Sequence, residues 1–290
     1  MAQERSVNGV VQGTGVHWVG DGFRVTNLFP SSNDLGERLS PFFLMDYHPP
    51  FDYGPTQHPR GVGAHPHRGI ETITLAFEGA VAHHDSTGGG GIIGPGDVQW
   101  MTAAGGILHK EYHEASWAAR GGTMHMMQLW VNLPAAHKMD PPRYQPLVAG
   151  EMGQVVLPDD SGLVRVIAGE YQGTKGPAKT FSPINLWDLR LSAGGRMDMS
   201  FPASQNAGLF VLDGTIVANG TKAEAEELIV FDNVGEKIDV ESERGAHLLV
   251  LNGEPIDEPI VAYGPFVMNT EEQILEAYQD FEAGKFGYLD

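Results

Sequence analysis

The feature that most limits how this chain can fold is the shortness of its apolar segments, which turn residues interrupt throughout. Segments such as 23–29, 71–77, 126–133 and 186–191 have the length and side-chain composition of β-strands. The 38 glycines and 19 prolines fall largely between such segments, where chain reversals need them. This spacing predicts an all-β sandwich or barrel and argues against alternating strand and helix units.

One helix is predicted, close to the C-terminal end. Asn269 and Thr270 can cap its first turn, two acidic residues follow them, and Gly284 is placed to end it. The apolar stripe expected to pack against a barrel wall consists of Ile274, Leu275, Tyr278 and Phe281.

Composition excludes several classes of function. The formal net charge is −19, from 37 acidic and 18 basic residues, which disfavours direct binding to nucleic acid. The absence of cysteine rules out disulfides, thiolate catalysis and zinc sites built from cysteine. No apolar leader follows the first residues and no apolar run reaches membrane-spanning length, so we expect a cytoplasmic protein without membrane contact.

A domain boundary is predicted at residues 138–146, which contain three prolines and suit an extended connector. The resulting parts, 1–137 and 138–290, are each long enough for a core of their own. Residues 77–79 and 212–214 each place an acidic residue and a glycine between apolar stretches, a faint sign of internal duplication. Two similar barrels would account for the chain length.

The histidines are concentrated in the first part. Eleven of the twelve lie at or before His137, and only His247 lies later. If the two parts share a fold, only the N-terminal one can therefore build a histidine-rich site.

Two pairs of potential metal ligands have the spacing of one strand face. They are His65 with His67, and His109 with Glu111. Residues two apart in a strand point the same way, so two such strands side by side bring four nitrogen and oxygen ligands to one point. A single pair of this kind is often a surface pair that binds nothing, but two pairs in glycine-punctuated strands favour a metal site. The ligand set suits iron, manganese, nickel, copper or zinc.

Pro66, between the first two histidines, predicts that its segment is an edge strand, a bulge or a strand start.

The other N-terminal histidines are expected elsewhere. We predict a surface role for His83, His84 and Asp85 at a strand end, a loop for His113 and Glu114, a core or pocket-lining place for His125, and pocket walls for His48 and His58.

Several motifs, which follow one another in the same order along the chain, closely resemble those of the pirin family. They are His-Pro-His-Arg-Gly-Ile-Glu-Thr at 65–72, Gly-Pro-Gly-Asp-Val-Gln-Trp-Met-Thr at 94–102, Gly-Ile-Leu-His-Lys-Glu at 106–111, Gln-Leu-Trp-Val-Asn-Leu-Pro at 128–134 and Gly-Pro-Phe-Val-Met-Asn-Thr at 264–270. The resemblance implies a bicupin, in which two cupin (jelly-roll) β-barrels lie face to face and a short helix ends the chain. It further implies that the N-terminal barrel holds one divalent metal through His65, His67, His109 and Glu111.

Glu71 is an alternative carboxylate ligand. The spacing of His65, His67 and Glu71 also fits the first motif of the wider cupin superfamily, and strand alternation lets Glu71 face inward. Only the resemblance to pirins favours Glu111, in which case Glu71 supports the ligands or is structural. The C-terminal part has no histidine at 200–206, and His247 alone cannot hold a metal, so that barrel is predicted to be structural.

The resemblance also implies an activity. Some bacterial pirins are similar to quercetin 2,3-dioxygenases, which open a flavonol ring with O₂ and release CO. We therefore expect a metal-dependent dioxygenase acting on a small phenolic or flavonol substrate, with iron(II) first among the candidate metals and Glu111 as proton acceptor. The alternatives are a non-catalytic metal- or redox-sensing regulatory protein with an unidentified protein partner, or another metalloenzyme, since a fold does not fix function.

Overall fold

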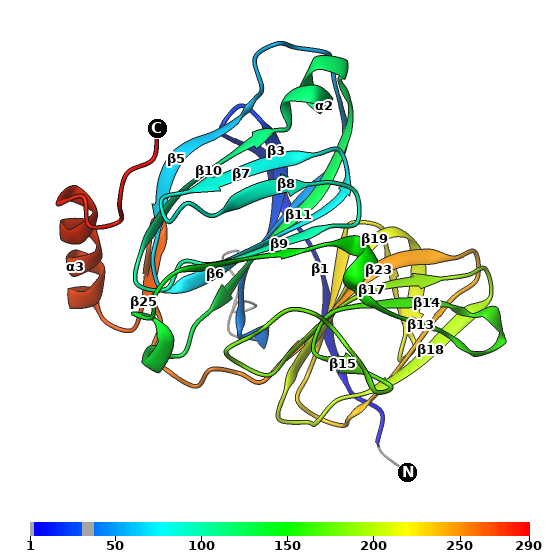
Figure 1. Ribbon diagram of the computed structural model, residues 1–290. Helices are drawn as coiled ribbons and strands as arrows, with labels where there is room; N and C mark the ends of the chain where they lie inside the picture. The colour runs from blue at the N-terminus through cyan, green and yellow to red at the C-terminus, as the bar shows by residue number, and fades with distance from the viewer. Residues whose placement is uncertain (1–2, 31–37) are drawn as a thin grey trace. The chain divides into compact units, whose positions relative to one another are not determined.

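The structure of the chain, a computed structural model, describes residues 3–30 and 38–290, which are mostly β-strand (Figure 1). Contacts between residues divide the chain into two compact units. Unit 1 comprises Met1–Thr14, Leu28–Phe42 and Gly150–Pro255, and unit 2 comprises Gly15–Asn27, Phe43–Ala149 and Ile256–Asp290. The predicted all-β class with a C-terminal helix is confirmed.

Unit 2 is built on two antiparallel sheets. The larger has the strand order β12-β9-β6-β11-β4-β3-β2, and the smaller has the order β5-β10-β7-β8. Their strands are β2 (Thr14–Val19), β3 (Phe23–Phe29), β4 (Phe42–Tyr53), β5 (Gly61–His67), β6 (Ile70–Glu78), β7 (Val81–Asp85), β8 (Gly90–Ile93), β9 (Val98–Thr102), β10 (Ile107–His113), β11 (Gly122–Asn132) and β12 (Arg143–Leu147). The unit also contains α2 (Ala115–Arg120), η1 (Ala135–His137), β24 (Val261–Tyr263), β25 (Phe266–Met268) and α3 (Glu271–Glu282).

Unit 1 is organised around one ten-stranded sheet and a large apolar core. Trp187, Phe201, Leu209 and Phe231 are among the buried side chains that fill this core. Its elements are β1 (Val7–Gln12), η2 (Ala149–Glu151), β13 (Gly153–Val156), η3 (Pro158–Asp160), β14 (Gly162–Ala168), β15 (Glu170–Tyr171), β16 (Thr174–Lys175), β17 (Ile184–Leu191), β18 (Gly195–Ser200), β19 (Asn206–Ala218), β20 (Thr221–Glu224), β21 (Glu227–Phe231), β22 (Lys237–Ser242) and β23 (Ala246–Gly253).

The C-terminal helix begins where the sequence predicts but buries a different face. Thr270 caps α3 and forms a capping box with Gln273. Leu275 and Phe281, both assigned to the buried stripe, are 63% and 39% exposed, so that part of the prediction is wrong. The helix packs against β24 and β25 through a narrower face centred on Ala277, whose small side chain permits close approach. Among the described residues no helix combines the length and apolarity needed to cross a membrane.

The proline-rich segment 138–146 runs into a strand. Its last residues belong to β12, which pairs with β9 at the edge of the larger sheet of unit 2. Pro146 is tolerated there because an edge strand leaves some N–H positions unpaired. By contacts, unit 2 continues to Ala149 and also takes in residues 256–290. The division into folding domains at residues 137 and 138 remains a prediction.

Candidate metal centre

Strands β5 and β10 carry the two predicted ligand pairs and are hydrogen-bonded neighbours. His65 lies opposite His109, and the register shifts between His109 and Glu111, as at a β-bulge. Strand β5 is the outer strand of its sheet, so Pro66 occupies an edge strand, as predicted. The i, i+2 rule places both members of each pair on one face of their strand, and the pairing of β5 with β10 brings the two pairs together.

The three predicted histidine ligands come together. Ring centroids lie 5.0 Å apart for His65 and His67, 4.2 Å for His65 and His109, and 4.9 Å for His67 and His109. One nitrogen from each ring lies within 4.8 Å of the others. Nδ1 of His65 faces Gly63 O at 2.8 Å, and Nδ1 of His67 faces Pro265 O at 3.2 Å. A carbonyl can only accept, so both rings carry hydrogen on Nδ1, which leaves Nε2 as the nitrogen that can bind a metal.

His109 supplies the observation that tests whether a metal fits. Its Nε2 is fully buried and has no hydrogen-bond partner in the described part of the chain. An unpaired buried polar atom is costly, and a metal ion would satisfy it. Burial, reinforced by the neighbouring imidazoles, lowers the pKa of His109 well below its usual value and that of His67 to about 3. These rings are therefore neutral, which is the form that binds metals.

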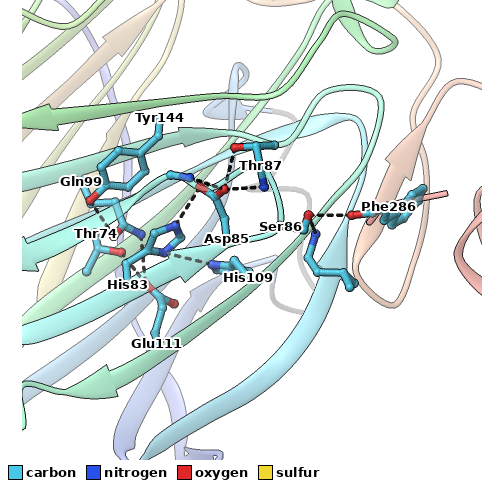
Figure 2. Close-up of polar contacts among 12 residues, drawn as sticks. Thr74, His83, Asp85, Ser86, Thr87, Gln99, His109, Glu111, Tyr144 and Phe286 are labelled. Atoms are coloured by element: carbon cyan, nitrogen blue, oxygen red, sulfur yellow. Dashed lines mark hydrogen bonds and ion pairs between the residues drawn. The ribbon is translucent and has the colours of Figure 1, made fainter. Parts of the chain in front are cut away.

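Glu111 lies beside the triad and is held by two donors. Thr74 Oγ1 and Gln99 Nε2 each donate to Glu111 Oε1 at 3.1 Å (Figure 2). Its ligand oxygen lies within 4.8 Å of ring nitrogens of His109 and His83, so Glu111 joins a second potential ligand group that shares His109 with the first. The combination of His65, His67, His109 and Glu111 as one ligand set remains a proposal.

His83 and Asp85 are buried, and the surface role predicted for them is wrong. Strand β7 is an inner strand, paired with β10 on one side and β8 on the other, so alternate side chains turn inward. His84 between them is exposed, as predicted. Nδ1 of His83 lies 3.4 Å from Nδ1 of His109, and its Nε2 lies 3.4 Å from Asp85 Oδ2 (Figure 2). The i, i+2 spacing of His83 and Asp85 is the sequence feature that could have predicted that both side chains point to the same face.

Asp85 is also tied to the backbone of the following turn. Its Oδ1 accepts from Thr87 N at 2.9 Å, Thr87 Oγ1 at 2.6 Å and Gly89 N at 3.0 Å. Burial alone would raise the pKa of Asp85, but the hydrogen bonds from His83, Thr87 and Gly89 outweigh it and lower that pKa to about 2. Asp85 is therefore an ionised acceptor at neutral pH.

Four other histidines lie in different places. His113 is buried at the end of β10 and contacts Gly22 O at 2.8 Å, so the predicted loop is wrong. Glu114, which follows it, caps α2. His125 is a core histidine bonded to the hydroxyl of a neighbouring tyrosine at 2.9 Å, as expected. His48 lines the cavity described below, whereas His58 is exposed and does not.

Glu71 lies apart from both potential ligand groups of the described residues. It is buried on β6, where its Oε1 accepts from Thr102 Oγ1 at 2.7 Å and lies 3.8 Å from Arg143. Burial raises the pKa of Glu71 to about 7, against the hydrogen bonds and the nearby guanidinium that lower it. This arrangement favours the structural alternative for Glu71.

A cavity of about 410 Å³ opens beside the histidines. Its walls are mostly apolar, with His65, His67, Glu111 and Gln128 among the polar groups. Trp130 packs against His67 at a ring-centroid distance of 4.9 Å. The apolar lining consists of Val19, Phe23, Val25, Val62, Met126, Trp130 and Pro265. Apolar walls with a few convergent polar groups are typical of small-molecule sites.

Comparisons with known proteins agree with this fold. A protein of Pseudomonas aeruginosa, named provisionally as a quercetin 2,3-dioxygenase, is 50% identical over 282 residues, which are 97% of this chain and 98% of that protein. The crystal structure of quercetin 2,3-dioxygenase from Acinetobacter baumannii matches with a TM-score of 0.94 at 46% identity, covering 99% of this chain and all of that one. A pirin from Escherichia coli in complex with nickel(II) shares the fold, with a TM-score of 0.66 at 19% identity over 85% of this chain and 99% of that one.

Two family models also match. The model described as pirin covers residues 22–131, and the model described as the pirin C-terminal cupin domain covers residues 186–287. The chain belongs to the pirin family of bicupins.

Proposed function

We propose that this protein is a metal-dependent dioxygenase that cleaves the central ring of a flavonol with O₂ and releases CO, as a quercetin 2,3-dioxygenase does. The observation that carries the proposal is the convergence of three imidazoles, two of which (His65 and His67) line an apolar cavity, with the buried Nε2 of His109 unpaired in the described structure. The similarity to proteins named for this activity supports it. The strongly acidic composition disfavours the alternative of a nucleic-acid binder.

His65, His67, His109 and Glu111 would hold one divalent cation. Three nitrogen donors and one carboxylate suit iron(II), which we propose first, and also manganese, nickel, copper or zinc. When bound, such an ion supplies positive charge that lowers the pKa of a flavonol hydroxyl, and it supplies open positions for the oxygen chemistry.

The protein side chains would orient the substrate and move a proton. The apolar walls formed by Phe23, Met126 and Trp130 suit a flat aromatic molecule and exclude water from it. Thr74 and Gln99 both donate to Oε1 of Glu111, so Oε2 has no hydrogen bond in the described part of the chain. Glu111 Oε2 would accept the proton of the flavonol hydroxyl while Thr74 and Gln99 hold the carboxylate in place.

Metal-loaded protein mixed with quercetin under air tests this proposal. The protein should be loaded separately with each first-row metal, and both the loss of flavonol absorbance and the release of CO should be followed. We expect turnover with at least one metal and its loss in His65→Ala and Glu111→Gln. His84→Ala is the matched control, because His84 is exposed on a neighbouring strand and should retain full turnover.

Absence of CO release with every metal would refute the dioxygenase proposal. If the same protein also captured a defined partner only in one oxidation state of its metal, the regulatory alternative would replace it.

A further inference from the structure

His109 differs from the other two histidines in what its Nδ1 meets. Nδ1 of His65 and of His67 each face a backbone carbonyl, which fixes the hydrogen on that nitrogen. Nδ1 of His109 instead faces Nδ1 of His83 at 3.4 Å. Either ring could donate in such a contact, so the contact alone does not say which nitrogen of His109 keeps a lone pair.

Asp85 removes this ambiguity. Its Oδ1 is occupied by three donors from Thr87 and Gly89, and its Oδ2 lies 3.4 Å from Nε2 of His83. An ionised carboxylate can only accept, so Nε2 of His83 carries hydrogen, and in the neutral ring the lone pair lies on Nδ1. His109 must then donate through Nδ1, which leaves the lone pair of its Nε2 free to bind a metal.

The surroundings of His83 restrict the orientation of its imidazole ring. The His83 and Asp85 side chains are fully buried, and Tyr144 stacks on the imidazole of His83 at 4.9 Å with an interplanar angle of 17°. The hydroxyl of Tyr144 donates to Gln99, which in turn donates to Glu111 (Figure 2). The same cluster thus reaches both His109 and Glu111.

We propose that Asp85 and His83 are positioning residues that fix the tautomer of His109, so that Nε2 of His109 is presented as a metal ligand. This inference rests on the proposed function, because it takes His109 as a metal ligand. Outer hydrogen-bond partners of this kind commonly set the orientation of a ligating imidazole and are worth about 10- to 100-fold in metal affinity.

The decisive variant is Asp85→Asn, because the turn dictates how the new amide must lie. The three donors at the Oδ1 position require the amide oxygen there, so the amide NH₂ faces Nε2 of His83. His83 Nε2 then accepts, its Nδ1 carries the hydrogen and donates to His109 Nδ1. His109 is left with hydrogen on Nε2, the nitrogen that should bind the metal.

Two variants of His83 separate this effect from simple loss of a contact. In His83→Gln, the amide NH₂ can donate to Asp85 while the amide oxygen accepts from His109, which preserves the native hydrogen-bond direction. His83→Leu leaves His109 with no side chain to dictate its tautomer. We therefore expect metal affinity to fall in the order wild type and His83→Gln, then His83→Leu, then Asp85→Asn, with the last about 10- to 100-fold weaker than wild type.

Two measurements test the proposal without relying on enzymatic turnover. Chelator competition gives the dissociation constant for nickel(II) and zinc(II), and ¹⁵N NMR of labelled histidines in the metal-free protein reports which nitrogen of His109 is protonated. We expect hydrogen on Nδ1 in the wild type and on Nε2 in Asp85→Asn. Adding Asp85→Asn to His83→Leu should weaken binding no further, because the relaying ring is gone. His84→Ala should leave both measurements unchanged.

Folded Asp85→Asn protein with hydrogen still on Nδ1 of His109 and wild-type metal affinity would overturn the inference. So would an additional loss in the double variant equal to that seen in Asp85→Asn alone. A protein that shows the predicted tautomers and affinity order but never consumes a flavonol would contradict the proposed reaction and leave this inference standing.

Discussion

Glu71 should make the protein less stable as pH rises from mildly acidic to mildly basic. It is 1% exposed, and Oε2 of its carboxylate has no hydrogen-bond partner in the described structure. Burial raises its pKa from 4.5 to about 7 in the folded state. The folded protein therefore holds a proton that the unfolded chain releases, so its stabilising contribution is present at low pH and is lost as pH rises through 7.

The size of the effect follows from the two pKa values. With 4.5 for the unfolded chain and about 7 for the folded protein, the linkage relation gives a loss of about 2 kcal/mol in the free energy of unfolding between about pH 5.5 and about pH 8. In Glu71→Gln the side chain cannot ionise, so this loss should disappear. Only the difference between the two pH values matters, because the cost of burying the amide is the same at both.

Denaturant unfolding of metal-free protein at the two pH values, followed by tryptophan fluorescence, measures this difference. About pH 5.5 is the practical lower limit, because the isoelectric point of about 4.9 favours association below it. The matched control is Glu78→Gln, which removes an exposed carboxylate from the same strand and should follow the wild type.

Equal losses in the wild type and in Glu71→Gln would refute the reasoning, since Glu71 would then be ionised in the folded protein. The same variant also decides between the two carboxylate candidates for the metal. Glu71→Gln should bind nickel(II) as the wild type does, whereas a loss matching that of Glu111→Gln would assign Glu71 as a ligand.

Three further outcomes are expected. Lys138→Met should lower the free energy of unfolding by about 3 kcal/mol, because the buried ammonium donates to three acceptors that the variant leaves unpaired, and urea unfolding would show it. Met126→Trp should fill part of the cavity and weaken quercetin binding by about tenfold or more, equivalent to about 1.4 kcal/mol, at unchanged metal content, measured by anaerobic titration. Metal added at 100 times its dissociation constant should stabilise the protein by about 2.7 kcal/mol, and a melting temperature independent of metal would contradict the site.

The parts of this protein that can be predicted from sequence are those governed by local rules. Strand alternation places His65 with His67 and His109 with Glu111, and the same rule gives β3 its observed bounds, Phe23–Phe29. The histidine triad follows once two such strands are neighbours. Alternation needs no knowledge of distant residues, which is why these predictions hold.

The errors arise where a side chain's surroundings depend on strand pairing. His83 and Asp85 have the same spacing as the ligand pairs, yet a pair alone does not say which face of the sheet is covered. The pairing of β7 with both β8 and β10 makes it an inner strand, and no local sequence pattern predicts this pairing. Tyr144 was missed for a related reason, because β12 joins the sheet from within a proline-rich stretch that indicates only extended chain.

The least predictable contribution comes from the C-terminal segment, which returns to unit 2 after the chain has built unit 1. Pro265 accepts from Nδ1 of His67 through a backbone carbonyl, and a carbonyl carries no sequence signal. Arg68, next to His67, is buried against Asp280 at 2.8 Å and lies over the ring of Phe286 at 4.7 Å. These contacts fix the orientation of His67 from about 200 residues away in the sequence. The tautomer of one proposed ligand thus depends on the C-terminal segment, and that of another depends on β7, so no short motif contains the whole site.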